Sequence, residues 1–305
     1  MGLLIGDALG VPYEFHDPSA LPPLAEIDFE PPNRFSRSHP GVSPGTWSDD
    51  GAQALVLLHS LLECGRFDAL HFASGLIRWY DDGFMAVDGV FDVGVQTATA
   101  LGHLKRGVSP LEAGAGDERS NGNGSLMRVL PLALWHRGTD EELVRDAREQ
   151  SRVTHAHLRS QLCCALYCLW ARGILEDFEQ PFDRAVATLR GLYHEATPER
   201  AELDFFIRPE DAHQCRGSGY VVDSLFSAQR ACDEDSFEAV VKFAISLGQD
   251  TDTTACLAGG IAGLQLGLNA IPTRWREALR GDWIYEPLLD RLLQRADSVE
   301  ADPIT

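Results

Sequence analysis

The sequence has no long apolar run that is free of charged residues, and no stretch rich in proline, glycine and serine that would join separate domains. The missing apolar run argues against a transmembrane helix, which needs about 20 predominantly apolar residues. The missing linker favours one domain over most of the 305 residues. We predict a single domain at 1–295 and a loose C-terminal tail at 296–305.

Positive charge is scarce as well, because 26 Lys and Arg face 46 Asp and Glu and give a formal net charge of −20. Phosphate backbones and anionic lipid headgroups would be repelled by such a surface. We therefore predict no nucleic-acid partner and no membrane partner. The same charge favours solubility and attracts cations or basic partners.

The seven cysteines include no Cys-x-x-Cys pair, and their number is odd. Cys163, Cys164 and Cys168 lie inside the apolar run at 162–170. Buried thiols in a reducing compartment fit this pattern better than disulfides or a zinc site. We predict a cytoplasmic protein.

Strand-like alternation of apolar and polar residues is absent, and so is any internal repeat. Apolar residues recur at helical spacing, which predicts an all-α protein with site residues on loops at helix starts. Glycines at positions 2, 6 and 10 would line one side of a helix and let another backbone approach closely. Irregular loops are predicted at 15–46 and 195–219. Helices are predicted at 47–63, 67–80, 96–105, 129–135, 160–175, 221–232, 236–247 and 255–268, with closing helices that end near Arg295.

Two short segments, Ser48–Asp50 and Asp250–Thr253, place carboxylates and hydroxyls directly before an apolar helix. Capping explains one acidic residue at a helix start, and the helix dipole explains a second. Neither effect requires the arrangement twice. Facing carboxylates would repel one another unless a cation lay between them, so the sequence predicts a site for a hard divalent metal ion.

Other residues are candidates for the same site, each with a simpler alternative. Glu14 is either a surface carboxylate after a helix end or a site residue, and Asp92 is either a helix cap or a site residue. The loop Ser120–Ser125 combines glycines with polar side chains before an apolar helix, which suits phosphate binding but is also typical of turns. His155 precedes a helix, where capping is the alternative.

Two known metal-site patterns compete for the second acidic segment. An EF-hand counted from Asp250 would need Gly and Glu where Ala255 and Ile261 stand, so that hypothesis fails. Asp250, Asp252 and Thr254 fit the Asp-x-Asp-x-Thr pattern of haloacid-dehalogenase-like phosphotransferases. Those enzymes place the pattern after an early strand, so a phosphotransferase is the less favoured alternative.

Five motifs in order resemble the ADP-ribosylglycohydrolases, the family that includes dinitrogenase-reductase-activating glycohydrolase. The resemblance implies an orthogonal multi-helix bundle around a cleft that holds two magnesium or manganese ions. It also implies hydrolysis of the bond between ADP-ribose and a modified side chain. The motifs are Gly6–Gly10 with Glu14, Ser48–Asp50, Ser120–Gly124 with Met127 and Arg128, Thr154–His155, and Gly248–Thr254.

The resemblance also implies roles for individual residues. Glu14 and Asp92 are the candidates for proton acceptor or donor, and Asp50 is expected to serve catalysis as well as metal binding. Two divalent ions would fix the distal ribose and activate the attacking water. Tyr220 matches an aromatic position near the adenosine. The metal-ligand positions match Ser48, Asp49, Asp50, Asp250, Asp252 and Thr253, and those near the diphosphate and its ribose match Ser120, Asn121, Gly122, Asn123, Gly124, Ser125 and His155.

Three positions depart from the family pattern. Gly51 replaces a common threonine, Gln249 replaces the usual second glycine before the aspartates, and Val95 stands where a polar residue is frequent. None of these changes removes a presumed ligand. We predict a metal-dependent hydrolase that acts on an ADP-ribosylated protein, with arginine as the favoured acceptor and serine-linked or O-acetyl ADP-ribose as alternatives. The sequence does not give the oligomeric state, and a monomer is favoured. The alternative is a module that binds ADP-ribose or neutralises a toxin without hydrolysis.

Overall fold

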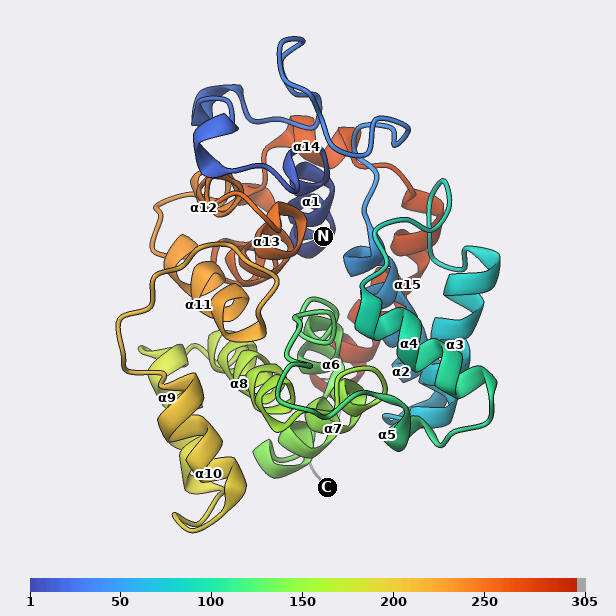
Figure 1. The fold of residues 1–305 in the computed structure, drawn as a ribbon, viewed down its shortest axis with the longest axis vertical. Coiled ribbons are helices and arrows are strands. Elements are labelled where there is room, and N and C mark those ends of the chain that lie inside the picture. The colour runs from blue at the N-terminus through green and yellow to red at the C-terminus, as the bar shows by residue number, and fades with distance from the viewer. Residues whose placement is uncertain (301–305) are drawn as a thin grey trace.

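The computed structural model describes the backbone of residues 1–300 and the side chains of residues 1–296. The structure is 61% helical without strands in this part of the chain, which confirms the predicted all-α class. Figure 1 shows the helices running in several directions around a central region, with α1 and α13 on one side of it and α2 and α4 on the other. No helix among the described residues has the length and apolar character to cross a membrane.

The predicted helices are all present, with ends shifted by a few residues. Short 3-10 turns lie at Val11–Tyr13, Pro18–Ala20, Leu24–Glu26 and Leu268–Ala270. The α-helices are α1 (Gly2–Gly10), α2 (Asp49–Cys64), α3 (Ala69–Asp82), α4 (Val95–Lys105), α5 (Pro110–Ala113), α6 (Leu130–Trp135), α7 (Asp140–Arg152), α8 (Leu158–Leu175), α9 (Pro181–Gly191), α10 (Pro198–Glu202), α11 (Val221–Ala231), α12 (Phe237–Ser246), α13 (Thr251–Leu266), α14 (Thr273–Ala278) and α15 (Asp282–Glu300).

Two predictions of irregular structure were wrong in part. The segment 195–219 contains α10 and a π-helical turn at Leu203–Ile207, whose Leu203 and Ile207 are buried. The last helix continues to Glu300, past the predicted end at Arg295, and the rest of the predicted tail lies outside the described residues. In the segment 195–219, a short buried pair among polar residues gives too weak a periodic signal to be recognised as helical.

The helix α7 was not predicted, because its charged residues obscure a narrow apolar stripe. Leu143, Val144 and Ala147 are its buried apolar side chains. A capping box starts the helix: the Thr139 hydroxyl accepts a bond from the Glu142 amide at 3.2 Å, and the Glu142 carboxylate accepts one from the Thr139 amide at 2.8 Å. This reciprocal cap is the signal that could have located the helix.

The glycine stripe of α1 packs directly against the backbone of α13, as the four-residue spacing predicts. A Cβ on Gly6 would lie 2.0 Å from the carbonyl oxygen of Ala255, and one on Gly10 would lie 2.3 Å from Cα of Asp252. The Thr251 hydroxyl donates to the Gly10 carbonyl at 2.8 Å. The stripe therefore fixes where the second acidic segment stands relative to the end of α1.

Replacing Gly6 with alanine should destabilise the protein. Alanine favours a helix by about 1 kcal/mol over glycine, but forcing a methyl against a backbone carbonyl costs typically about 1–3 kcal/mol and sometimes more. We expect a lower melting temperature and reduced activity. Gly263→Ala is the matched control, because its Cβ would meet Gly2 at an ordinary 3.4 Å. A Gly6→Ala protein as stable as the Gly263→Ala protein would contradict close packing of the two helices.

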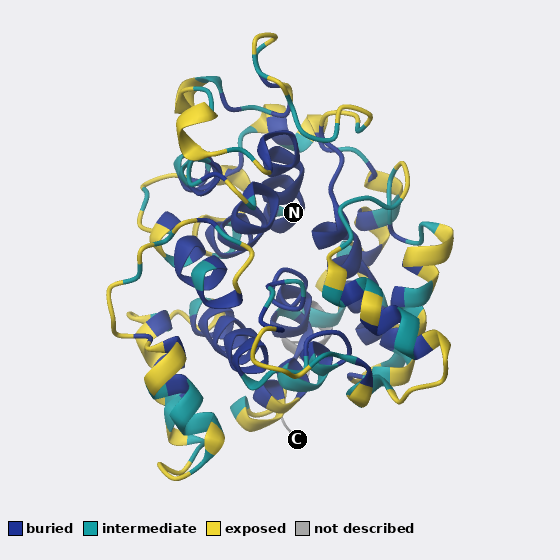
Figure 2. Ribbon diagram, viewed as in Figure 1, coloured by how far each residue is buried: buried dark blue, intermediate teal, exposed yellow. Residues whose placement is uncertain are grey.

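The core surrounds α8, which is buried along almost its whole length. Figure 2 shows buried residues on the inner helices and exposed residues on the outer sides of α9 and α10. Cys163, Cys164 and Cys168 all lie in this core with free thiols, which confirms that they are buried and not paired in disulfides.

Candidate metal centre and substrate cleft

The two acidic segments meet at the N-termini of α2 and α13. Asp49 and Asp50 lie in the first turn of α2 and Asp252 lies in the first turn of α13, whereas Asp250 is the residue directly before α13. The Thr253 hydroxyl donates to Asp50 Oδ2 at 3.3 Å, although the two residues are 203 positions apart. The pairing of two distant helix starts confirms that the segments form one cluster.

Several carboxylates in this cluster lack the partners that buried charges need. Asp50 and Asp252 are buried, yet Asp50 Oδ1 and Asp252 Oδ2 have no hydrogen-bond partner among the described residues. Burial, reinforced by neighbouring carboxylates, raises the pKa of Asp49, Asp50 and Asp252 well above the ordinary value. Such groups are costly unless a cation joins them. The donors are carboxylates and hydroxyls, so the site fits a hard divalent cation better than zinc.

Glu14 and Asp92 lie together beside the acidic segments. A carboxylate oxygen of Glu14 and one of Asp92 lie within 4.8 Å of each other. One carboxylate oxygen from each of Glu14, Asp250 and Asp252 lies within 4.8 Å of the others. Burial, reinforced by the Asp92 carboxylate, raises the pKa of Glu14 to about 10. A carboxyl group with its pKa raised this far holds a proton at neutral pH next to the reacting atoms and can donate it, as a general acid does.

His39 and Gln96 are two site residues that the sequence analysis missed. His39 Nε2 lies 2.7 Å from Glu14 Oε2. Gln96 lines the cleft, and its Oε1 accepts a bond from the Gly122 amide at 2.9 Å while its Nε2 has no partner among the described residues. The position of His39 in the long loop at 15–46 was a usable signal, because loops of that length are often functional. Gln96 carried no signal.

Asp7 organises the start of α2 from the facing helix α1. Its Oδ1 accepts a bond from the Ser48 amide at 2.9 Å, and its Oδ2 accepts one from the Gly51 amide at 2.7 Å. A Cβ on Gly51 would lie 2.9 Å from Asp7 Oδ2 and 2.8 Å from Leu4 Cδ2. A side chain at position 51 would therefore require the Asp7 or Leu4 side chain to move.

The buried carboxylates should give the metal-free protein an unusual pH dependence. Burial raises the pKa of Asp7 from 3.8 to about 7, and the pKa values of Asp49, Asp50 and Asp252 shift in the same direction. A carboxyl group whose pKa is higher in the folded chain favours folding below its unfolded pKa and loses that contribution as the pH rises through the folded pKa. Metal-stripped protein should therefore melt at a higher temperature at pH 5 than at pH 8.

Added Mg²⁺ or Mn²⁺ should reverse this trend, because deprotonated carboxylates bind the cation and protons compete with it. Differential scanning fluorimetry of chelated and reloaded protein between pH 5 and 8 measures both effects. The melting temperature of the metal-stripped protein could instead rise with pH over this range. That result would contradict the claim that buried carboxylates oppose folding when they lose their protons.

The loop Ser120–Ser125 runs from the acidic cluster to His155. The Asn123 side chain donates to Asp250 Oδ2 at 2.8 Å. A Cβ on Gly124 would lie 2.9 Å from His155 Cε1, so glycine is needed there for contact with the ring. Burial and the nearby Arg128 charge lower the pKa of His155 to about 3. The imidazole is therefore neutral at physiological pH and can exchange a hydrogen bond with a ligand without adding charge.

Some of the predicted substrate-binding residues do not line the cleft. The Ser120 hydroxyl and the Asn121 amide donate to residues 117 and 118 at the start of their own loop. Ser125 is fully buried, with its hydroxyl 2.8 Å from that of Ser151. These side chains hold the shape of the loop. Ser120, Asn121 and Ser125 are therefore not among the residues proposed to contact the substrate directly.

Tyr220 lies just beyond the cleft. It is paired with Gly122 in an isolated β-bridge, and its hydroxyl accepts a bond from Arg159 Nη1 at 3.2 Å. Its side chain lines a neighbouring cavity of about 300 Å³ together with Phe206. Tyr220 therefore lies beyond the loop, on the side away from the carboxylates. Its contact with adenosine stays a prediction.

A cavity of about 370 Å³ joins the acidic cluster to the loop and His155. Ser48 and Asp252 are buried and do not line it. Phe15 and Val95 are exposed apolar residues on its wall. The predicted site residues that line it are Glu14, Asp49, Asp50, Asp92, Gly122, Asn123, Gly124, His155, Asp250 and Thr253.

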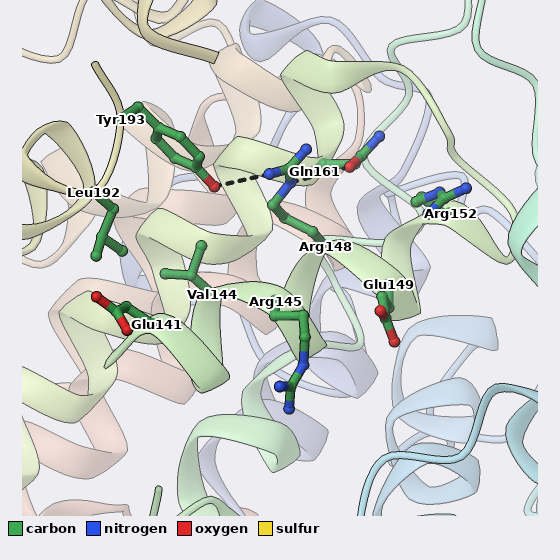
Figure 3. Close-up of a pocket in the computed structure, with 9 residues that line it drawn as sticks. All are labelled: Glu141, Val144, Arg145, Arg148, Glu149, Arg152, Gln161, Leu192 and Tyr193. Carbon is green, nitrogen blue, oxygen red and sulfur yellow. Dashed lines mark hydrogen bonds between the residues drawn. The ribbon is translucent and has the colours of Figure 1, made fainter. Parts of the chain in front are cut away.

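A second cavity, of about 410 Å³, lies between α7, α8 and the segment Leu192–Tyr193 (Figure 3). Arg148 there donates to the Tyr193 hydroxyl at 2.9 Å and to Glu199 at 3.0 Å. Glutamates line its walls beside the arginines, so their charges offset one another. It contains no residue of the acidic cluster and is not the candidate functional site.

A buried arginine connects the two ends of the cleft. Arg128 donates to Gln53 Oε1 at 2.7 Å and to Thr154 Oγ1 at 2.8 Å. Gln53 donates to Asp49 Oδ2 at 2.7 Å, and Thr154 Oγ1 lies 2.8 Å from His155 Nδ1. The resemblance included Arg128 without a role for it. In the structure, the Arg128 guanidinium is joined to Asp49 through Gln53. It is joined to His155 through Thr154.

An all-helical fold with a carboxylate-rich cleft between two helix N-termini defines a class of protein suited to holding divalent cations beside a polar ligand. The sequence model of a family described as ADP-ribosylglycohydrolase matches residues 1–302. The chain belongs to the ADP-ribosylglycohydrolase family. This assignment excludes the phosphotransferase alternative, whose Asp-x-Asp-x-Thr pattern would follow a strand.

Two relatives and one solved structure show the extent of the similarity. The ADP-ribosylarginine hydrolase Tri1 of Pseudomonas putida is 32% identical over 98% of this chain and 78% of its own length. The ADP-ribosyl-[dinitrogen reductase] glycohydrolase of Rhodospirillum rubrum is 26% identical over 92% of this chain and 88% of its own. A solved structure of an ADP-ribosylglycohydrolase-related protein complex has a TM-score of 0.74 at 30% identity, covering 96% of this chain and 94% of that one.

Proposed function

We propose that this protein is a metal-dependent hydrolase that removes ADP-ribose from a modified arginine side chain. The observation that carries the proposal is the meeting of two acidic helix starts, with unpaired buried oxygens on Asp50 and Asp252, in a cleft that continues to a glycine-rich loop. The similarity to an ADP-ribosylarginine hydrolase supports arginine as the acceptor. The acidic cleft suits a guanidinium for the same reason that it suits a cation.

The proposed ligands of two Mg²⁺ or Mn²⁺ ions are the hard oxygen donors of the acidic segments. Bound there, the ions would supply the charge that fixes the distal ribose and makes a water more acidic. Four aspartates bring about as much negative charge as two divalent ions bring positive charge. The proposed ligands are Ser48, Asp49, Asp50, Asp250, Asp252 and Thr253.

Glu14 is the proposed proton acceptor and donor. Glu14 is more deeply buried than Asp92. One of its carboxylate oxygens lies within 4.8 Å of a carboxylate oxygen of Asp250 and of one of Asp252. Asp92 and His39 hold its carboxyl group from two sides. In the reaction, the bond from the anomeric carbon to the guanidine nitrogen breaks and the water oxygen takes its place. The water proton passes through Glu14 to the departing guanidine, so the products are ADP-ribose and unmodified arginine.

The other end of the cleft is the proposed site for the diphosphate and its neighbouring ribose. Gly122, Asn123 and Gly124 expose backbone to the cavity, and the neutral His155 completes this wall. Gln96 lines the same wall, and its buried Nε2 has no hydrogen-bond partner among the described residues. Backbone amides and neutral side chains can donate hydrogen bonds to a diphosphate without adding positive charge beside the metal ions.

The proposal includes the setting in which the protein works. All seven cysteines are free, which fits a reducing compartment such as the cytoplasm. We propose that the protein acts as a monomer, because every group in the proposed mechanism belongs to this chain.

The test is release of ADP-ribose from arginine-modified and serine-modified proteins, with magnesium and with a chelator. We expect release from the arginine linkage, its loss on chelation, and its recovery when Mg²⁺ or Mn²⁺ is restored. No release from either linkage, by protein whose metal content has been measured, would overturn the proposal. Tight ADP-ribose binding without hydrolysis would instead support the binding or toxin-neutralising module.

A further inference from the structure

Phe15 is an exposed aromatic residue on the wall of the cleft, directly after Glu14. Its side chain is 67% exposed, although large apolar side chains gain by burial. It lines the cavity at the end where Glu14, Asp92 and Asp250 gather. An exposed phenylalanine on the wall of a polar cleft contributes little to the core. Exposed apolar residues at such places often contact a ligand, which suggests that Phe15 contacts the substrate.

The backbone holds Phe15 in a strained conformation. Its φ angle is 62°, in the left-handed region that favours glycine, and Gln249 has a φ of 61°. The two segments are tied together, because the Phe15 amide donates to the Gln249 carbonyl at 2.6 Å and the Gln249 amide donates to the His16 carbonyl at 2.8 Å. This tie fixes Phe15 next to the start of the second acidic segment. Strain of this kind persists where function selects the geometry.

Neighbouring rings determine how the Phe15 side chain is placed. Its centroid lies 5.8 Å from that of His39, and His39 lies 5.2 Å from Phe91. His39 also contacts the Glu14 carboxylate, so the Phe15 ring stands beside the proposed proton donor. Phe15 and the proposed proton donor therefore line the same end of the cavity.

We propose that the Phe15 ring binds the guanidinium group of the ADP-ribosylated arginine and so selects arginine-linked over serine-linked ADP-ribose. The inference rests on the proposed function and deepens it. A guanidinium is planar, delocalised and weakly hydrated, and it stacks on the negative face of an aromatic ring. A serine linkage offers no cation at that place. Nearby carboxylates strengthen the preference for a positively charged acceptor.

The experiment compares Phe15→Leu, Phe15→Trp and a matched control, Phe205→Leu, whose wild-type side chain is 73% exposed outside this cavity. Steady-state kinetics are measured on peptides that carry ADP-ribose on arginine or on serine, together with the Kd for free ADP-ribose. We expect Phe15→Leu to lower kcat/KM about tenfold for the arginine linkage, mainly through KM. The serine linkage and the ADP-ribose Kd should not change. Phe15→Trp should retain the preference, and Phe205→Leu should behave as wild type.

Two outcomes would overturn the inference. One is a Phe15→Leu protein that keeps the arginine preference unchanged. The other is an equal loss for both linkages and for ADP-ribose binding, which indicates a structural role for the ring. An inactive wild-type protein with verified metal would instead contradict the proposed function, so the two failures are distinguishable.

Discussion

Replacing Asp252 with asparagine is expected to lower kcat by about 10³-fold or more. The asparagine oxygen can still accept the bond from the Thr253 amide, which is 2.9 Å long in the wild type. What is lost is the negative charge on an oxygen that has no other partner. Removing a metal ligand costs several kcal/mol of charge stabilisation in the transition state, and each 1.4 kcal/mol is a factor of about ten. Turnover on arginine-linked ADP-ribose and calorimetric metal affinity measure the effect.

The same substitution should stabilise the metal-free protein. Burial and repulsion from neighbouring carboxylates raise the pKa of Asp252, which means that the charged form opposes folding when no cation is present. We expect metal-stripped Asp252→Asn to melt above metal-stripped wild type, and to gain nothing when metal is added. Asp235→Asn removes a charge from an exposed position and is the matched control. A metal-stripped variant that melts below wild type would contradict this account of the cluster.

Glu14→Gln should lower kcat by about 10²- to 10⁴-fold, the usual contribution of a general acid or base. The glutamine fills the same space and can still bond to His39 and Asp92, but it cannot take up or release the proton. Metal affinity should change much less than in Asp252→Asn, because Glu14 is not one of the proposed ligands. Measurements of kcat at saturating metal, together with calorimetric metal binding, separate the two effects.

Asp92→Asn is the matched comparison for Glu14. Asp92 is only partly buried and is proposed to hold the Glu14 carboxyl group, so its loss should reduce kcat by a smaller factor. The pH profile should also shift, because the Asp92 charge contributes to the raised pKa of Glu14. If Asp92→Asn lowered kcat more than Glu14→Gln at saturating metal, Asp92 and not Glu14 would be the proton acceptor and donor.

Short-range patterns in the sequence were enough to predict the main features of the site. The glycines at positions 2, 6 and 10 predicted close helix packing, because the four-residue period places them on one side of any helix. Ser48–Asp50 and Asp250–Thr253 each place carboxylates and a hydroxyl at a helix start, and the repetition of that local pattern predicted a shared cation site. Both arguments depend on residues that are neighbours in the sequence.

Contacts between distant residues could not be predicted in this way. Asp7 is one buried carboxylate in an apolar helix, and nothing near it in the sequence shows that it caps α2. Arg128 follows a polar loop, and its bonds to Gln53 and Thr154 depend on how that loop packs against α2 and the turn after α7. His39 reaches Glu14 only because the loop at 15–46 folds back over it. These positions are set by tertiary packing, which local periodicity does not specify.

The most direct test of the account is a titration of metal-stripped protein with Mn²⁺, in which bound metal and ADP-ribose release from an arginine-modified protein are followed together. We predict no release without metal, two ions bound per chain, and activity that reaches its plateau when both are bound. Full activity in the stripped protein, or activity restored by metal that does not bind the chain with this stoichiometry, would contradict a binuclear site formed by the two acidic segments.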